Sequence, residues 1–279
     1  MKLSVIVVNY NMCTLLRQAL YTLTRACKFI DYELIIIDDV STDKSVKMLN
    51  EEFPDAKLIV NEQTLGIAAS RNKGIEMAGG EYILLVNADI ICGKKTIEQV
   101  VDFMDAHQDA GSVGVRALTP GGRFIPHSRT GFTKPWAALL KLTGLSKYFT
   151  KSRLYKNNNN WAEEDEFATT EVDVVNGAFM LLRKQALEQT GLLDEKLAYF
   201  GHDIDISFRL RLLGYKNYYY PRTYILSFNK QIKPTTSWNY IKHYYGAMFI
   251  FAAKYLFKKP ELKLPGIPQL FAPKYEIER

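Results

Sequence analysis

Cysteine is scarce in this sequence, and its placement argues against a disulfide-rich or zinc-binding protein. Only three of the 279 residues are cysteines, Cys13, Cys27 and Cys92, and no two of them form a Cys-x-x-Cys pair. An odd number of widely spaced cysteines indicates free thiols in a reducing compartment. A strand-like run begins at residue 3, so we expect no signal peptide.

Long apolar stretches and strongly basic tracts are also missing. No apolar run approaches the roughly 18 residues that a membrane-spanning helix needs. The 36 Lys and Arg residues against 30 Asp and Glu residues give a formal net charge of +6. This moderate basicity suits an anionic substrate or an anionic membrane surface. Because there is no Arg-rich tract or recognition-helix pattern, we expect no nucleic-acid partner. The expected location is cytoplasmic, with peripheral attachment to the cytoplasmic face of a membrane as an extension.

The hydrophobic residues, 47% of the sequence, fall into alternating strand and helix patterns. Short apolar runs, typical of buried parallel strands, are separated by segments whose apolar residues have helical spacing. The expected strands cover residues 3–9, 33–38, 57–60, 81–87 and 112–118, and the expected helices cover 12–27, 43–53, 66–78 and 94–107. This alternation predicts an α/β fold of three layers, α/β/α, with a mostly parallel central sheet.

The pattern changes after residue 118. The expected elements there are a helix at 134–148, a mobile polar loop at 151–170, a strand pattern at 171–183, a helix at 204–213, short aromatic strands at 218–228 and a long helix at 238–257. Four prolines follow between residues 260 and 273, which predicts an extended tail.

Aspartates stand at the points where apolar runs end. Asp38 and Asp39 follow the second strand, Asp89 follows the fourth, and Asp203 and Asp205 open a later helical pattern. In open α/β sheets, ligands bind outside the carboxyl ends of the strands. Carboxylates delivered there can hold a divalent metal together with a phosphorylated ligand.

These aspartates belong to motifs that occur in a fixed order. The motifs are Val5–Tyr10, Ile37–Asp43, Asn61–Gly74, Leu85–Asp89, Val175–Phe179, Gly191–Glu195 and His202–Asp205, the last leading to Arg209–Arg211. Together they resemble the inverting nucleotide-sugar glycosyltransferases of family 2, which have the GT-A (Rossmann-like) fold, and in particular the bacterial rhamnosyltransferase-like branch.

The sequence departs from the pattern of that family at three places. Asn87-Ala88-Asp89 stands where the family usually has Asp-x-Asp or Asn-Pro-Asp, and His202-Asp203 stands in place of Glu-Asp. The family often has a metal-binding histidine near residues 226–229, where this chain reads Leu-Ser-Phe-Asn.

The resemblance implies transfer of a sugar from a nucleoside-diphosphate sugar to a glycan or lipid-linked acceptor, with inversion, in cell-surface polysaccharide synthesis. It implies a glycosyltransferase domain over residues 1–230, with a nucleotide-binding part at about 1–118 and an acceptor part at about 119–230, and a C-terminal helix and tail over 231–279. Two alternatives stay open. A sugar nucleotidyltransferase would carry a Gly-rich basic loop after the first strand, where this chain has Asn9-Tyr10-Asn11-Met12. A non-catalytic sugar-nucleotide or glycan-binding module is the other.

On the donor side, the resemblance implies contacts with the nucleotide sugar from Val8, Asn9, Tyr10, Asp38, Asp39, Arg71, Asn87 and Asp89. Asp89 is expected to bind Mg²⁺ or Mn²⁺, which take one or two carboxylates plus phosphate oxygens; its plainer alternative is a helix N-cap. Asp38 binds the base or ribose, or forms a local turn. Arg71 pairs with the diphosphate or the base edge, or is a solvated helix arginine.

On the acceptor side, Asp203 is expected to be the catalytic base that takes the proton of the acceptor hydroxyl; the alternative is an N-cap. Gly177, His202 and Asp205 are expected to contact the acceptor, against the plainer roles of a strand glycine, a loop histidine and a second carboxylate at a helix N-terminus. The helix at 238–257 combines aromatics with lysines, which predicts either a membrane-interface helix or a core helix.

Overall fold

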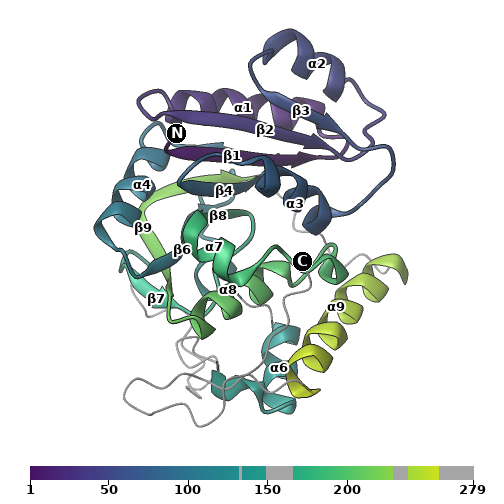
Figure 1. The fold of residues 1–279 in the computed structure, drawn as a ribbon, viewed down its shortest axis with the longest axis vertical. Helices are drawn as coiled ribbons and strands as arrows, with labels where there is room; N and C mark the ends of the chain where they lie inside the picture. Colours follow the sequence, from purple (N-terminus) through teal and green to yellow (C-terminus); the bar gives the residue numbers. More distant parts are fainter. Residues whose placement is uncertain (132–133, 149–165, 229–237, 258–279) are drawn as a thin grey trace.

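The computed structural model describes residues 1–131, 134–148, 166–228 and 238–257, and within these ranges the strands form one sheet with helices on both sides (Figure 1). The strands are β1 (Leu3–Asn9), β2 (Tyr32–Asp38), β3 (Lys57–Val60), β4 (Tyr82–Asn87), β5 (Ile90–Cys92), β6 (Ala110–Leu118), β7 (Thr170–Val172), β8 (Phe179–Arg183) and β9 (Lys216–Ser227). The helices are α1 (Cys13–Ala26), α2 (Ser45–Glu52), α3 (Ile67–Met77), α4 (Thr96–Ala106), α5 (His127–Thr130), α6 (Lys134–Leu142), α7 (Lys184–Thr190), α8 (His202–Leu212) and α9 (Trp238–Phe257).

The strand order is β3-β2-β1-β4-β8-β6-β9-β5, with β7 paired to β9. The first four strands are parallel to one another. Strand β8 then runs antiparallel between β4 and β6, while β6 and β9 are parallel. The predicted α/β fold with a mostly parallel central sheet is confirmed. The carboxyl ends of β1, β2 and β4 meet at one edge of this sheet, where ligands of open α/β folds bind.

Side chains that alternate along each strand supply two cores, one for each face of the sheet. Val5 and Val7 of β1 point to the face covered by α1 and α4, whereas Ile6 points to the face covered by α3, α7 and α8. The sheet is therefore the middle of three layers. The parallel strands are buried on both sides, which explains why their sequences read as continuous apolar runs.

Helix α9 packs against α6 and α8 and shares a third apolar core with them. Phe251 is 0% exposed and its ring lies 5.5 Å from that of Trp136 in an edge-on arrangement. Figure 1 shows α9 beside α6, and α6 and α2 toward opposite ends of the long axis. Within the described ranges, no helix has the length and apolar content to cross a membrane.

Two predicted elements are divided in the structure. The expected helix at 134–148 is α6 followed by a 3₁₀ helix, Leu145–Tyr148, because Gly144 takes a φ of +71° between them. The expected strand pattern at 171–183 is β7 and β8, joined by a loop that contains Gly177. Of the predicted loop at 151–170, residues 151–165 lie outside the described residues, and so does the predicted tail.

Candidate active site

The carboxyl ends of β1 and β2 bring polar side chains into contact. Asn9 and Asp38 are register partners, both 0% exposed. Asn9 Nδ2 donates to Asp38 Oδ1 (2.8 Å) and to Ser41 Oγ (3.0 Å), and the Ser41 N–H donates to Asp38 Oδ2 (2.8 Å). Asn9 Oδ1 is buried without a hydrogen-bond partner among the described residues. At the same end, Val8 is half-buried and Tyr10 is 56% exposed.

Asp39 points to the loop that leads from β3 to α3. Its Oδ1 accepts from Asn61 Nδ2 and from the Leu65 N–H (both 2.9 Å), and its Oδ2 accepts from the Gly66 N–H (3.3 Å). Asp39 is 5% exposed, and these bonds account for both of its oxygens. Asp39 therefore holds the loop between β3 and α3 in place. A groove of about 230 Å³, lined in part by Lys73, opens beside this loop.

Asp89 lies just beyond the end of β4 and is the carboxylate best suited to a metal. It is 8% exposed, and burial raises the pKa of its carboxyl group. Among the described residues, no side chain is hydrogen-bonded to it, and no group of three or more His, Cys, Asp and Glu residues could hold a metal ion. The ligand set thus fits a Mg²⁺ or Mn²⁺ ion shared between one carboxylate and ligand phosphates, and does not fit an all-protein metal site.

Arg71 of α3 lies between the end of β4 and the start of α8 and is 2% exposed. Its Nη2 donates to Asn87 Oδ1 (3.0 Å) and to the Gly177 carbonyl (2.7 Å), and its Nη1 lies 2.9 Å from His202 Nε2. Burial lowers the pKa of Arg71 to about 10, while the charge of Asp203 opposes this shift. The guanidinium is therefore a cation at neutral pH. Its two Nη atoms make these three contacts, whereas its buried Nε has no hydrogen-bond partner among the described residues.

Asp203 stands in the first turn of α8, one residue after the helix begins. Its Oδ2 accepts from the Gly177 N–H (3.0 Å) and its Oδ1 from the Ile204 N–H (2.9 Å). The N-cap position is Gly201, so Asp203 does not have the capping role that was the alternative. Each carboxylate oxygen has a second lone pair and can accept a further hydrogen bond. Asp203 is half-buried, so part of its side chain is accessible to solvent.

Two histidines, His202 and His127, lie close enough to Asp203 to feel its charge. His202 is 6% exposed, and burial, followed by the charge of Arg71, lowers its pKa to about 4. Desolvation also lowers the pKa of His127, the first residue of α5, against the opposing charge of Asp203. His127 was not predicted as a site residue, because it lies in none of the sequence motifs. Its only signal in the sequence is that histidine is rare, with four in the chain.

Asp205 is placed differently from the acceptor contact that was expected. It is 0% exposed, and its oxygens accept from Arg209 Nε (2.8 Å), Lys254 Nζ (2.8 Å) and Tyr255 Oη (2.6 Å). Burial acts to raise the pKa of Asp205, but Arg209 and Lys254 outweigh it and hold the pKa below its ordinary value. The Arg209 contact lies within α8, whereas the Lys254 and Tyr255 contacts join α9 to α8, so these interactions account for Asp205 as a structural residue.

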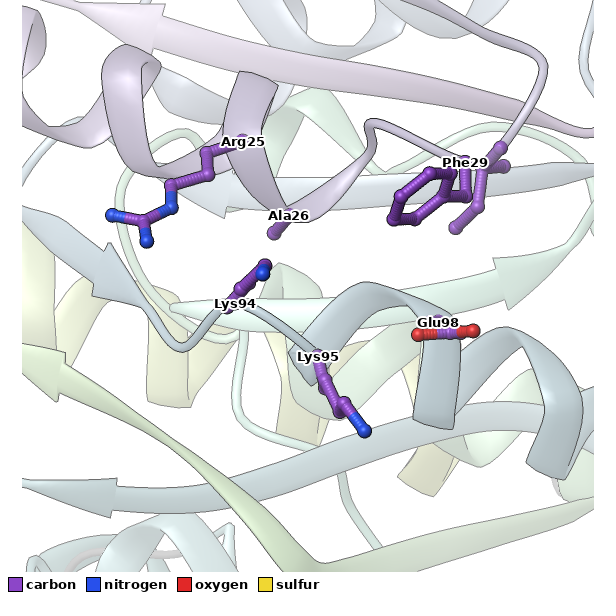
Figure 2. A pocket seen from close by; sticks show the side chains of 7 residues that line it. Arg25, Ala26, Phe29, Lys94, Lys95 and Glu98 are labelled. Atoms are coloured by element: carbon purple, nitrogen blue, oxygen red, sulfur yellow. The ribbon is translucent and has the colours of Figure 1, made fainter.

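A separate small pocket of about 90 Å³ shares no residue with this cluster. Figure 2 shows it between the end of α1, with Arg25, and the start of α4, with Lys94 and Lys95. Phe29, which lines it, is 78% exposed. This region combines basic side chains with an exposed aromatic ring.

Comparison with known proteins shows which family this chain is similar to. The sequence profile of glycosyl transferase family 2 matches residues 4–191. The poly(ribitol-phosphate) beta-glucosyltransferase of Bacillus spizizenii is 30% identical over 194 residues, which are 66% of this chain and 30% of that protein. The N-acetylglucosaminyl-diphospho-decaprenol L-rhamnosyltransferase of Mycobacterium tuberculosis is 23% identical over 240 residues, 80% of this chain and 75% of that protein. The chain thus spans under a third of the length of the Bacillus relative.

Solved structures with a similar fold contain nucleotide sugars. Staphylococcus aureus TarS 1–349 in complex with UDP-GlcNAc has a TM-score of 0.56 at 21% identity, covering 80% of this chain and 58% of that chain. The mannosyltransferase PcManGT from Pyrobaculum calidifontis, in complex with GDP-Man and Mn²⁺, has a TM-score of 0.57 at 18% identity, covering 93% of this chain and 70% of that chain. At these identities the likeness establishes the fold.

Proposed function

Because the chain belongs to glycosyl transferase family 2, we propose that it moves a sugar from a nucleoside-diphosphate sugar to a glycan or lipid-linked acceptor, with inversion at the anomeric carbon. The observation that carries this proposal is one chain of contacts. Asn87 bonds Arg71, Arg71 bonds the Gly177 carbonyl, and the Gly177 N–H bonds Asp203. The chain connects the end of β4, which bears Asp89, to the start of α8, which bears Asp203.

Inverting transfer is a direct displacement, so the acceptor hydroxyl must lose its proton as it attacks. Asp203 is the base in this proposal, and two backbone N–H groups hold its carboxylate in a fixed orientation. Such positioned bases contribute roughly 10²–10⁴ in rate. Gly177 lets an acceptor approach this backbone, because it has no side chain.

Asp89 holds the divalent cation, Mg²⁺ or Mn²⁺, together with the donor diphosphate. A bound cation neutralises charge that develops on the leaving diphosphate. The buried carboxylate has no side-chain hydrogen-bond partner among the described residues, and burial raises its pKa. Both observations support this assignment, because a nearby cation would stabilise a poorly solvated carboxylate. The family's structural neighbour with GDP-Man and Mn²⁺ supports the choice of ligands.

The nucleoside part of the donor is assigned to the ends of β1 and β2. Asn9 Oδ1 has an unused acceptor position there, and Asp38 is held beside it. Tyr10 is exposed at the same end and offers an aromatic face to a base. Asp39 contributes indirectly by fixing the β3–α3 loop.

Two substitutions separate binding from chemistry, with UDP-GlcNAc and GDP-mannose as the donor probes. Asp203→Asn is expected to lower turnover roughly 10²–10⁴-fold while donor affinity stays within a few-fold, because the amide keeps the shape but cannot take a proton. Asp89→Ala is expected to lose the Mn²⁺-dependent part of donor affinity. Calorimetry with and without Mn²⁺, and release of nucleoside diphosphate, measure the two effects.

Asp102→Asn, an exposed carboxylate on α4, is the control and should change neither quantity. Wild-type turnover in Asp203→Asn would remove this residue from the base role. Donor binding without any donor cleavage in the parent protein would favour the non-catalytic binding module.

The proposal extends to a peripheral contact with the cytoplasmic face of a membrane. The relative from Mycobacterium tuberculosis is named for a lipid-linked substrate, a diphospho-decaprenol. In this chain, Trp238, Tyr245 and Phe249 of α9 are 76%, 53% and 74% exposed, and Lys242 is exposed on the same helix. Aromatics with basic residues on one helix face suit a membrane interface.

A further inference from the structure

The guanidinium of Arg71 connects three segments of the chain inside the site. Arginine at such a position would be expected to bind the diphosphate, because its planar fork matches phosphate oxygens. Here the side chain is 2% exposed, and its Nη atoms bond one group from each of three elements. These groups are Asn87 at the end of β4, the Gly177 carbonyl in the β7–β8 loop, and His202 at the start of α8.

The contact with His202 fixes the protonation of that ring. Arginine has only donors, so His202 Nε2, 2.9 Å from Arg71 Nη1, has to accept the hydrogen bond. The proton of the ring therefore lies on Nδ1, and the ring is neutral. The pKa of about 4 is consistent with this state. Within the described residues no carboxylate forms an ion pair with Arg71, so its charge acts on Asp203 without a closer anion.

Gly177 connects Arg71 to Asp203. A Cβ atom at Gly177 would lie 3.2 Å from Arg71 Nη1 and 3.2 Å from Asp203 Cβ. Those separations are tighter than nearly all real Cβ contacts, so a larger residue would push the guanidinium and the aspartate apart. The glycine thus permits one peptide unit to bond Arg71 through its carbonyl and Asp203 through its N–H.

We propose that Arg71 is a positioning residue that sets the separation between the metal-binding Asp89 and the base Asp203, and that neutral His202 is the acceptor that orients it. This rests on the proposed function. Asn87, which Arg71 holds, stands two residues before Asp89, and His202 directly precedes Asp203. Arg71 therefore acts on turnover through its neighbours and leaves the donor to other residues.

The kinetic test compares Arg71→Lys with Arg183→Lys. Lysine keeps the charge but cannot reach three partners with one ammonium. Arg183 is the matched control, because it is also buried and bonds backbone carbonyls, at the opposite ends of the strands. Arg71→Lys is expected to lower kcat at least 30-fold, with the Kd for UDP-GlcNAc and Mn²⁺ within threefold. Arg183→Lys is expected to lower stability with kcat of the folded fraction unchanged. A 30-fold weaker donor Kd with unchanged kcat in Arg71→Lys would make Arg71 a donor ligand and overturn the proposal.

A spectroscopic test does not depend on activity and separates this inference from the proposed function. Nitrogen-15 NMR of the histidine rings should give His202, assigned by its loss in His202→Gln, the pattern of a neutral Nδ1–H tautomer between pH 6 and 8. In Arg71→Lys that pattern should change. An Nε2–H tautomer in the parent protein would overturn the proposal even if the enzyme transfers sugar.

The choice of substitution at His202 gives a rescue experiment. Gln offers a carbonyl oxygen that can accept from Arg71, whereas Leu offers none. His202→Gln is expected to lose at least tenfold less turnover than His202→Leu. The double variant Arg71→Lys/His202→Leu should be no worse than the poorer single variant, because both remove the same contact. Equal losses in the Gln and Leu variants, or additive losses in the double variant, would contradict the inference.

Discussion

His202 links the stability of the protein to pH. Its pKa is lowered to about 4 in the folded state, against about 6.5 in an unfolded chain. Between these values the unfolded state binds more protons, so the contribution of His202 to stability is complete above the unfolded pKa and falls as pH drops toward the folded pKa. Parent protein and His202→Gln are to be compared by urea unfolding at pH 7.5 and 5.0. The parent should lose more stability than the variant, by up to about 1.4 kcal/mol for each pH unit below 6.5. Equal losses would show that folding does not lower the pKa of His202.

The residues that end parallel strands were predictable, and the residues that meet across the fold were not. Asn9 and Asp38 were both expected in the nucleotide pocket, because the resemblance places them there and Asp38 ends an expected strand, and the structure pairs them. Arg71 shows the opposite case. Helical spacing indicates which residues share a face of α3, but the partners at 87, 177 and 202 are distant in sequence, so neither the burial nor the hydrogen bonds of Arg71 could be read from it. The placement of Asp205 in a buried ionic cluster also depends on α9, which follows it by more than thirty residues.

Among the elements, α9 has one face that packs against α8 and one face that is exposed. The inner face carries Lys254, which bonds both Asp194 and Asp205, and Tyr255, which bonds Asp205. Asp205 belongs to the same first turn of α8 as Asp203. The sequence left two roles open for this helix, core packing or membrane contact. The inner face has residues suited to core packing, and the exposed face has residues suited to membrane contact. Composition alone could not separate the faces, because aromatic residues occupy both.

Lysines on the two faces of α9 provide a matched pair for a stability experiment. Lys254→Met removes a cation from a buried carboxylate, and it should destabilise the protein by about 1–3 kcal/mol, below the value for a fully buried pair because Lys254 is partly exposed. Lys242→Met, on the exposed face, should stay within about 0.5 kcal/mol of the parent. Urea unfolding measures both. A Lys254 effect as small as that of Lys242 would mean that α9 does not brace the start of α8.

For the protein as an assembled unit, the alternation of strands and helices predicted the layers but not the full order of the sheet. The insertion of antiparallel β8 between β4 and β6 is a choice among distant pairings. The segment from residue 171 to 183 was expected to have one strand pattern because Val172, Val174 and Val175 are apolar, but Val174 and Val175 lie in the loop between β7 and β8. This insertion has a functional consequence, since it brings the Gly177 loop next to the end of β4.

The surface of the assembled protein offers two aromatic and basic regions that could meet an anionic bilayer, and they can be told apart. The outer face of α9 has exposed residues at positions 238, 242, 245, 249 and 256, spacings that place them on one helix face. There is no Asp or Glu in α9. Each basic residue near an anionic surface contributes about 1 kcal/mol, and inserted aromatics add apolar burial.

The competing region is the pocket of Figure 2, with Phe29 beside Lys94 and Lys95. Because Phe249 and Phe29 are similarly exposed, 74% and 78%, Phe249→Asp and Phe29→Asp form a fair comparison. Flotation with vesicles of phosphatidylglycerol and phosphatidylcholine should recover the parent protein and Phe29→Asp, and should recover at least tenfold less of Phe249→Asp. Vesicles of phosphatidylcholine alone, or added salt, should reduce recovery of all three, since screening weakens the charge term. Loss of flotation only in Phe29→Asp would move the contact to the α1–α4 side, and no flotation of the parent would leave the outer face of α9 without a membrane role.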